Sequence, residues 1–371
     1  SNWMMPRCQE PDSCCDIYSG RDNQMNGGCT MRIGLVDVDG HNFPNLPLMK
    51  LSAWHKRQGD SVEWYEPLLS GHMDRVYISK VFSFSPDYER CIDADEVIKG
   101  GSGYCIHLED GEEVYDTEKD SLLPPGIETI YPDYKIYYGK IPEVKNTAYG
   151  FMTRGCPRGC KFCHVGCKEG RKSYKAADLD TFWRGQKNIV LLDPNITACK
   201  DWKELFQQLI DSSAWVDFSQ GVDIRLMTEE KAGMIKRIRT KNIHFAWDSY
   251  GDREEIIPKL RMFRKLTGWS YQQLTVYVLT NFNTTHEQDL DRIYTLRDLG
   301  FNPYVMIYNK DDFVVRDKRG KPMRRKPAGE LLKKYTEEEI KHFDKCWDLQ
   351  GWVNNRIIFR SCNSFRDYRR R

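Results

Sequence analysis

The sequence predicts an α/β protein in which a small Rossmann-like domain precedes a partial parallel barrel of six strand–helix units. Two patterns indicate this fold. Short apolar runs of strand length alternate with amphipathic helical stretches through the middle of the chain, an order typical of parallel sheets. Polar residues recur directly after these strands, which is where α/β barrels place their chemistry. With 371 residues, the chain is long enough for one large or two ordinary domains.

The composition changes along the chain and divides it into four segments. The first segment is polar, shows no periodicity and carries four cysteines, and the last segment begins with a loop rich in basic residues. We assign an irregular Cys-containing leader to 1–30, the Rossmann-like domain and its connector to 31–143, the partial barrel to 144–310, and the basic loop with a helical extension to 311–371.

The Rossmann-like domain is predicted from short strands around one helix. Leu48, Leu51 and Trp54 form an apolar helical stripe, and Gly59 ends that helix. Pro and Gly punctuate residues 102–142, which predicts an irregular connector. We expect strands at 32–38, 61–65, 75–82 and 96–98, and the helix at 46–58.

The barrel segment repeats a strand and then a helix. Thr285 and Gln288 form a capping-box pattern that opens the last of its helices, and Thr336 with Glu339 opens a further helix near the C-terminus. Residues 351–365 are aromatic and apolar, so we expect them to pack against the barrel. The barrel strands are expected at 147–152, 188–192, 215–218, 243–247, 274–279 and 303–307, and its helices at 201–210, 228–238, 254–266 and 285–299.

Three cysteines in one short loop are the most specific feature of the sequence. Cys156, Cys160 and Cys163 are separated by three and two residues, so a single loop can wrap around one cluster. Cysteine thiolates are the usual ligands of iron–sulfur clusters. A cubane cluster has four irons, so three cysteines leave one iron open to another ligand.

This C-x3-C-x2-C loop, with the aromatic Phe162 before its third cysteine, resembles the signature of the radical S-adenosylmethionine (radical SAM) superfamily. The N-terminal unit resembles the cobalamin-binding-like domain that precedes the radical SAM core in one branch of that superfamily. The resemblance implies that Cys156, Cys160 and Cys163 bind a [4Fe–4S] cluster whose open iron is chelated by SAM. An electron from the cluster would then cleave SAM to a 5′-deoxyadenosyl radical, which abstracts hydrogen from a substrate that the sequence does not identify. The reaction implies an electron donor such as flavodoxin or ferredoxin.

The polar residues that follow the barrel strands are candidates for binding SAM. The guanidinium fork of Arg225 suits the SAM carboxylate. Asp193 or Asn195 stands where members of the superfamily carry a glycine-rich motif ending in an acid, and would bind the amino group, although this chain lacks the glycines. Asp248 or Ser249 suits the ribose hydroxyls. The full set of expected cofactor-binding residues adds Phe162 against the adenine, and Gln220 and Asp223 facing SAM or substrate.

Two other reactions of the same superfamily remain open. Methylthiolation of a tRNA or a ribosomal protein would suit the basic run at 316–326. Cobalamin-dependent methylation would suit Asp39 and His41, which begin a D-x-H pattern, but Pro44 stands where the motif needs glycine, so we do not expect cobalamin to bind. The second cluster that methylthiolation needs could be held by leader cysteines, which are Cys8, Cys14, Cys15 and Cys29.

An alternative interpretation is that the chain is not an enzyme but a zinc-stabilised nucleic-acid-binding module. Cys167 follows Cys163 by four residues, so four thiolates lie within twelve residues, enough for a tetrahedral zinc site. Cys167 could also close the cluster, face a substrate or pack in the core. A nucleic-acid-binding module would not explain the repeated strand–helix pattern of the barrel. Analysis of the protein for iron, sulfide and zinc distinguishes the radical SAM enzyme from the zinc-stabilised module.

Charge and cysteine content favour a cytoplasmic protein. The formal net charge of +2 gives no global argument for nucleic-acid binding. No apolar run approaches the ~20 residues that span a bilayer, and no signal-peptide pattern opens the chain, so we expect no membrane partner. Thirteen cysteines without such a signal indicate metal ligation and buried thiols in a reducing compartment.

Overall fold

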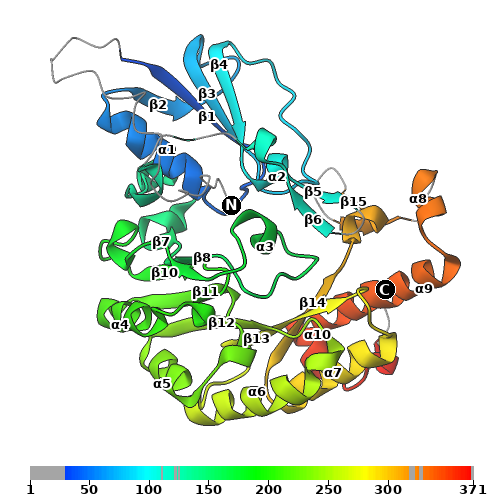
Figure 1. The fold of residues 1–371 in the computed structure, drawn as a ribbon. Coiled ribbons are helices and arrows are strands. Elements are labelled where there is room, and N and C mark those ends of the chain that lie inside the picture. Colours follow the sequence, from blue (N-terminus) through cyan, green and yellow to red (C-terminus); the bar gives the residue numbers. More distant parts are fainter. Residues whose placement is uncertain are drawn as a thin grey trace. The chain divides into compact units, whose positions relative to one another are not determined.

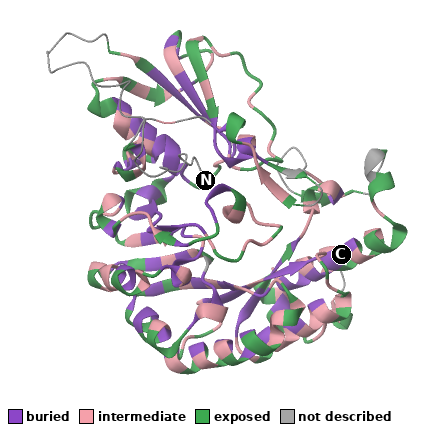
Figure 2. Cartoon of the chain, in the orientation of Figure 1, coloured by how far each residue is buried: buried purple, intermediate pink, exposed green. Residues whose placement is uncertain are grey.

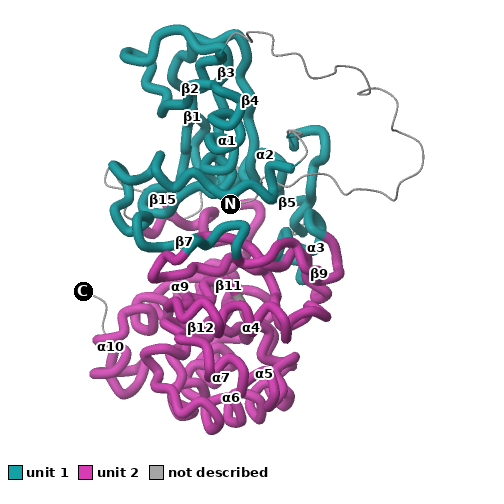
Figure 3. Tube along the Cα trace, turned by 90° about the vertical axis from the view of Figure 1, so that its left-hand side faces the viewer, with its two compact units in different colours: residues 1–148, 159–169, 180–184 teal, residues 149–158, 170–179, 185–371 magenta. Residues whose placement is uncertain are grey.

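The computed structural model describes residues 30–109, 112–120, 123, 126–316, 322–325 and 329–368, and it is an α/β protein with parallel sheets (Figure 1). The chain forms two compact units (Figure 3). The cysteine loop passes from one unit to the other after Arg158. Unit 1 comprises residues 1–148, 159–169 and 180–184, and unit 2 comprises residues 149–158, 170–179 and 185–371.

Unit 1 contains a four-stranded sheet in the order β2-β1-β3-β4, in which every pairing is parallel. The chain leaves β1 toward β2 on one side and returns to β3 on the other, so the sheet has a topological switch point between β1 and β3. Helix α1 begins because the Asn45 side chain accepts the N–H of Leu48, and its apolar side packs against the sheet. The elements are β1 (Arg32–Asp37), α1 (Leu46–Arg57), β2 (Ser61–Trp64), β3 (Met73–Ser79), β4 (Ala94–Gly100) and α2 (Ser102–Cys105).

The connector of unit 1 is more regular than the sequence predicted. An antiparallel hairpin is formed by β5 (Ile106–Glu109) and β6 (Glu112–Tyr115). The prediction of an irregular connector is therefore wrong over this stretch. Strands of four residues are too short to show a periodicity, and cross-strand pairing with an apolar pair at Ile106 and Tyr115 holds them together. Four short 3-10 helices complete the connector, at Thr117–Lys119, Ile127–Thr129, Tyr134–Tyr137 and Pro142–Lys145.

Unit 2 is built on a six-stranded sheet whose order, β14-β13-β12-β11-β10-β7, follows the order of the sequence. The pairings from β10 to β14 are parallel, which brings the carboxyl ends of these strands to one edge of the sheet. Buried residues concentrate on the strands and on the inner faces of the helices (Figure 2). The strands are β7 (Thr147–Gly150), β10 (Asn188–Leu191), β11 (Trp215–Gly221), β12 (Thr240–Ala246), β13 (Leu274–Thr280) and β14 (Asn302–Ile307), and the helices are α4 (Trp202–Ser212), α5 (Glu229–Arg237), α6 (Arg253–Thr267) and α7 (His286–Asp298).

Two strand ends differ from the prediction, and both differences affect the site. The strand expected at 147–152 ends as β7 at Gly150, and a separate strand, β8 (Thr153–Arg154), pairs antiparallel with β9 (Tyr174–Lys175). The strand expected at 215–218 continues to Gly221, so Gln220 lies inside β11. Pairing with β12, which carries register shifts here, extends this strand beyond its apolar run.

The C-terminal extension packs on the sheet as expected. Helix α9 contacts β14, and Val305 and Ile307 of that strand share a core with Phe343 and Trp352 of α9. Both predicted capping boxes are confirmed, at Thr285 for α7 and at Thr336 for α9. The elements here are β15 (Val314–Arg316), β16 (Pro322–Arg324), α3 (Val165–Lys168) in the cysteine loop, α8 (Glu330–Lys334), α9 (Glu337–Val353) and α10 (Arg356–Ser361).

Two of the predicted features lie wholly or largely outside the residues that the structure describes. The four leader cysteines and most of the basic run, residues 317–321 and 326, lie outside the described residues. Arg324, which is described, pairs with Asp344 of α9. No helix in the described part of the chain is both long and apolar enough to cross a membrane.

A buried ion pair joins α7 to the sheet of unit 2. The side chains of Arg292 and Asp289 are fully buried, and their Nη2 and Oδ1 atoms are 2.6 Å apart. The same guanidinium donates to the carbonyl oxygens of Trp247 and Asp248, at the end of β12, and of Leu279 in β13. One side chain therefore fixes two strand ends at the carboxyl edge.

We predict that Arg292→Met lowers the free energy of unfolding by about 3–5 kcal/mol, because it leaves the Asp289 charge buried without its partner. The control is Arg253→Met, which breaks a partly exposed pair with Asp291 and should cost less than about 1 kcal/mol. Urea denaturation of both variants measures the difference. Equal, small losses would show that the buried pair does not hold the edge together.

Candidate functional site

The first half of the cysteine loop, in unit 2, is anchored by backbone contacts. The N–H of Cys156 donates to the carbonyl oxygen of Gly170 at 3.1 Å. Gly155 has a φ of +75°, and a Cβ there would lie 2.2 Å from the carbonyl oxygen of Lys172. Only glycine fits such a turn, so the residue before the first cysteine is dictated by the loop that follows.

The second half of the loop, in unit 1, holds the other two cysteines. The N–H of Cys163 donates to the carbonyl oxygen of Cys160 at 3.0 Å, and α3 begins two residues later. Phe162 lies between them and is half-buried. Cys160 and Cys163 are partly exposed, as is Cys156 in unit 2, so a ligand can reach each of the three thiols.

Cys167 lies on α3 and differs from the three loop cysteines. Its side chain is exposed, and its Sγ donates to the carbonyl oxygen of His164 at 3.2 Å. Partial burial raises the pKa of the Cys167 thiol above its usual value. A metal ligand must be a thiolate, so this environment does not favour Cys167 as a ligand.

Asp193, directly after β10, anchors the entrance to the cysteine loop. Its carboxylate accepts the N–H of Met152 at 3.0 Å, and the N–H and the hydroxyl of Thr153, both at 2.6 Å. Burial raises the pKa of Asp193 to about 6, and the three hydrogen bonds oppose that rise. Both carboxylate oxygens already have partners within the chain.

Asn195 reaches the first cysteine of the loop. Its Nδ2 lies 3.5 Å from Cys156 Sγ, and its Oδ1 accepts the Thr197 hydroxyl at 2.8 Å. Because Thr197 occupies the amide oxygen, the NH2 group is the one that faces the sulfur. The Ser173 hydroxyl donates to the Asn195 carbonyl oxygen at 3.1 Å, which fixes the backbone as well. The structure thus brings together two predicted site residues, Asn195 and Cys156.

A four-residue ion network follows β11. Arg225 Nε and Arg158 Nε lie 2.8 Å and 2.7 Å from the two oxygens of Asp223, and Arg225 Nη1 lies 2.7 Å from Asp252 Oδ2. Burial alone would raise the pKa of Asp223, but the two guanidinium groups hold it below its usual value. Asp223 and Arg225, both predicted to face SAM, therefore bind each other. The two guanidinium groups and the two carboxylates balance in charge, and Arg158 has the most exposed side chain of the four.

The sequence analysis did not identify Arg158, Asp252, Thr197 or Ser173 as part of this site. The position of Arg158 between two cysteines of the loop could have identified it as a site residue. The other three residues contact Arg225 or Asn195 from separate segments, and no local pattern marks them.

The remaining candidates lie at the same edge of the sheet but outside these contacts. Gln220 is exposed at the end of β11. Burial raises the pKa of Asp248 to about 6, and the guanidinium groups of Arg292 and Arg225 oppose this rise, so Asp248 lies within electrostatic reach of the ion network. Ser249 is exposed, and its carbonyl oxygen accepts the indole N–H of Trp247. The roles of these residues toward SAM stay predictions.

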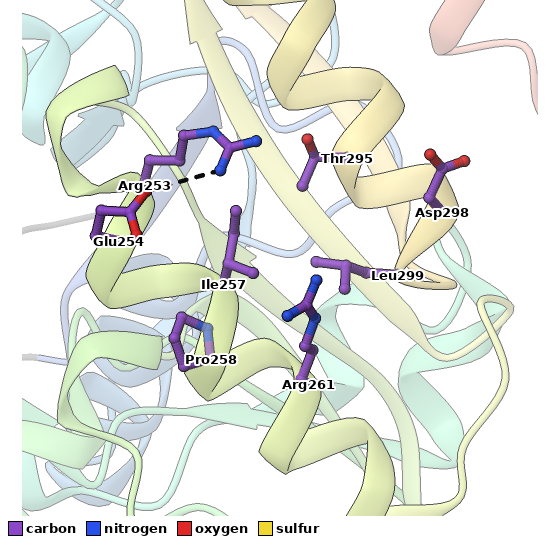
Figure 4. A pocket seen from close by; sticks show the side chains of 8 residues that line it. All are labelled: Arg253, Glu254, Ile257, Pro258, Arg261, Thr295, Asp298 and Leu299. Atoms are coloured by element: carbon purple, nitrogen blue, oxygen red, sulfur yellow. Dashed lines mark ion pairs between the residues drawn. The ribbon is translucent and has the colours of Figure 1, made fainter.

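A pocket of about 540 Å³ lies elsewhere in unit 2, between α6 and α7 (Figure 4). Charged side chains such as Arg253 and Arg261 line it, and Arg253 pairs with Glu254 inside α6. None of the residues predicted from the sequence to bind a cluster or SAM lines this pocket.

The carboxyl edge of the unit 1 sheet is closed by its own side chains. The Asp39 carboxylate, after β1, accepts the N–H groups of Val81 and Phe82, both at 2.9 Å, and so ties the loop after β3 across the switch point. Next to β4, a Cβ on Gly101 would lie 2.3 Å from the carbonyl oxygen of Lys80. These contacts tie the loops that follow β1, β3 and β4 to one another.

A buried hydrogen-bond network lies at the same edge of the sheet. The Tyr137 hydroxyl donates to Asp37 Oδ2 at 2.5 Å and accepts the N–H of Asn45 at 3.0 Å. The Asn45 amide donates to the Ser79 hydroxyl at 2.8 Å. These groups join the ends of β1 and β3 to the start of α1, and they satisfy one another.

Comparison with known proteins places the fold. No protein-family model and no curated protein sequence matches the chain. Among solved structures, it is similar to TsrM from Kitasatospora setae, a radical S-adenosylmethionine methyltransferase with cobalamin and a [4Fe–4S] cluster bound. The TM-score is 0.53 at 11% sequence identity, over 78% of this chain and 73% of that chain. The resemblance seen in the sequence is thus supported at the level of the fold, which is similar to that of this radical SAM protein.

The raised pKa of Asp193 predicts a pH-dependent stability. The group titrates at about 6 in the folded chain against an ordinary value of 3.8, so between these pH values the folded chain holds a proton that the unfolded chain releases. The free energy of unfolding of the wild type, minus that of Asp193→Asn, should fall by up to about 3 kcal/mol as pH rises from about 4 to about 6. Urea denaturation across this range measures it. A difference that rises with pH would show that hydrogen bonding, rather than burial, dominates.

Proposed function

From a radical SAM fold and the cysteine loop that it carries, we propose that the chain is an enzyme that cleaves SAM reductively. The six-stranded sheet of unit 2 is its partial barrel, and the sheet of unit 1 is its Rossmann-like, cobalamin-binding-like domain. The observation that carries the proposal is the C-x3-C-x2-C loop, whose first thiol is contacted by Asn195 from the carboxyl end of β10.

The donor set of the loop fits a [4Fe–4S] cluster. Cys156, Cys160 and Cys163 would hold three irons, and no fourth thiolate is needed. When bound, the cluster supplies the electron for cleavage of SAM, whose 5′-deoxyadenosyl product abstracts hydrogen from a substrate yet to be identified. An electron donor such as flavodoxin or ferredoxin would serve it.

The chain's own residues prepare this site in three ways. Asp193 holds the backbone at the entrance of the loop, because three donors converge on its buried carboxylate. Asn195 directs an N–H group at the Cys156 sulfur. Arg158 and Arg225 place positive charge beside the loop, where the SAM carboxylate can be bound through a guanidinium. Asp223 keeps the two guanidinium groups in place.

The acid of the D-x-H pattern is engaged within unit 1. In a D-x-H pattern the acid would orient the histidine, but Asp39 instead accepts two backbone N–H groups of the loop after β3. We therefore propose no step through cobalamin, although TsrM is a methyltransferase that binds it.

The direct test is anaerobic reconstitution with iron and sulfide, reduction with dithionite in the presence of SAM, and chromatography for 5′-deoxyadenosine. We expect product from the wild type and none from Cys160→Ala, which removes a cluster ligand. The matched control is Cys167→Ala, which should keep most of the activity because its thiol is hydrogen-bonded within α3. A colourless protein that contains zinc and forms no product would favour the zinc-stabilised nucleic-acid-binding module.

The contact between Asn195 and Cys156 predicts a shift in the reduction potential of the cluster. An N–H donor stabilises the additional negative charge of the reduced state, so Asn195→Ala should lower the potential. A bond that is about 1 kcal/mol stronger in the reduced state corresponds to about 40 mV. A redox titration monitored by electron paramagnetic resonance measures it.

Gln220→Ala is the control for this titration, because Gln220 is exposed at a neighbouring strand end. It should leave the potential unchanged. Equal reduction potentials for the wild type and Asn195→Ala would show that the Asn195 amide does not act on the cluster.

A further inference from the structure

Metal-binding side chains from two helices converge in unit 2, away from the cysteine loop. His342 and Cys346 are one turn apart on α9, and Asp289 lies on α7, which packs against α9. Cys346 Sγ is 3.6 Å from His342 Nε2 and 3.9 Å from Asp289 Oδ2. The ligand atoms of all three residues lie within 4.8 Å of one another.

The carboxylate of Asp289 has one oxygen directed at this cluster. Its Oδ1 is used by Arg292, while its Oδ2 faces the Cys346 thiol, which is a weak hydrogen-bond donor. Asp289 and Cys346 are fully buried. A buried carboxylate oxygen whose partner is a distant thiol is poorly satisfied, and a cation at this point would satisfy it.

A further histidine in the first turn of α7 is not one of these ligands. His286 Nδ1 is shielded from solvent and has no hydrogen-bond partner among the described residues. His286 precedes Asp289 by three residues, which puts both side chains on the same face of the helix. Its ligand atoms lie outside the group of three, and its ring packs against Phe365 with 5.3 Å between the ring centroids. The three ligands therefore come from two adjacent helices, Asp289 from α7 and the pair of His342 and Cys346 from α9.

We propose that Asp289, His342 and Cys346 bind a zinc ion, with the fourth tetrahedral position open to a solvent molecule. Zinc takes sulfur, nitrogen and oxygen ligands in a tetrahedron, and bond lengths of about 2.0–2.3 Å put neighbouring ligand atoms roughly 3.5 Å apart. The distances of 3.6 Å and 3.9 Å are close to that spacing. The site joins α9, and so the C-terminal extension, to α7 of the sheet. It is structural, because its ligands come from the packed side of both helices.

The test uses the full chain with Cys156, Cys160 and Cys163 replaced by alanine, so that the cysteine loop cannot take up metal. This parent is loaded with zinc, dialysed and analysed for metal, next to the same chain with His342→Gln or Cys346→Ala. We expect each variant to lose about one zinc per chain relative to the parent. Cys362→Ala, in the same C-terminal extension, is the control and should lose none.

Cobalt provides an independent readout, because a thiolate bound to Co²⁺ gives a charge-transfer absorption. That absorption should diminish in Cys346→Ala and persist in Cys362→Ala. His342 is only partly buried, so His342→Gln keeps the fold and decides the outcome if Cys346→Ala proves unstable. Unchanged zinc content and cobalt absorption in His342→Gln would overturn the proposal. The result does not depend on SAM cleavage, since the parent lacks the cluster ligands.

Discussion

The buried carboxylate of Asp193 is the interaction on which the geometry of the cysteine loop depends. It accepts three hydrogen bonds from Met152 and Thr153, which fixes the chain where it leaves β7 and enters β8. Asn195, two residues further, then reaches Cys156. The end of one strand therefore positions both the backbone of the loop and its first thiol. Burial makes this arrangement sensitive, because the carboxylate has no water to replace a lost donor.

The two parallel sheets use their carboxyl edges in different ways. In unit 2 the edge carries the guanidinium groups of Arg158 and Arg225, which are paired with the carboxylates of Asp223 and Asp252. In unit 1 the edge carries Asp39 and the network of Tyr137 and Asn45, whose polar groups bind one another or the backbone. Binding sites of open α/β sheets lie at such edges, so the paired charged side chains at the unit 2 edge are the candidates for contact with a ligand. Fold similarity to a cobalamin protein does not by itself provide a corrin site.

Local sequence patterns predicted most of the elements and the loop, because their causes are local. The capping boxes at Thr285 and Thr336 need only neighbouring residues, and the spacing of Cys156, Cys160 and Cys163 lies within one loop. Patterns of this kind cannot show which side chains meet across the sheet. The pairing of Asp223 with Arg225 and Arg158, and the convergence of α7 with α9, depend on register and packing between distant segments. The hairpin of β5 and β6 escaped prediction because each strand is only four residues long.

The central claim is that the loop binds a cluster with an iron left open for SAM. Electron paramagnetic resonance of the anaerobically reconstituted, reduced protein tests it most directly, with and without SAM. We predict a signal of a reduced [4Fe–4S] cluster whose shape changes when SAM is added, because SAM becomes a ligand of the open iron. A cluster signal that SAM leaves unchanged, or a protein that takes up zinc in place of iron and sulfide, would contradict the claim.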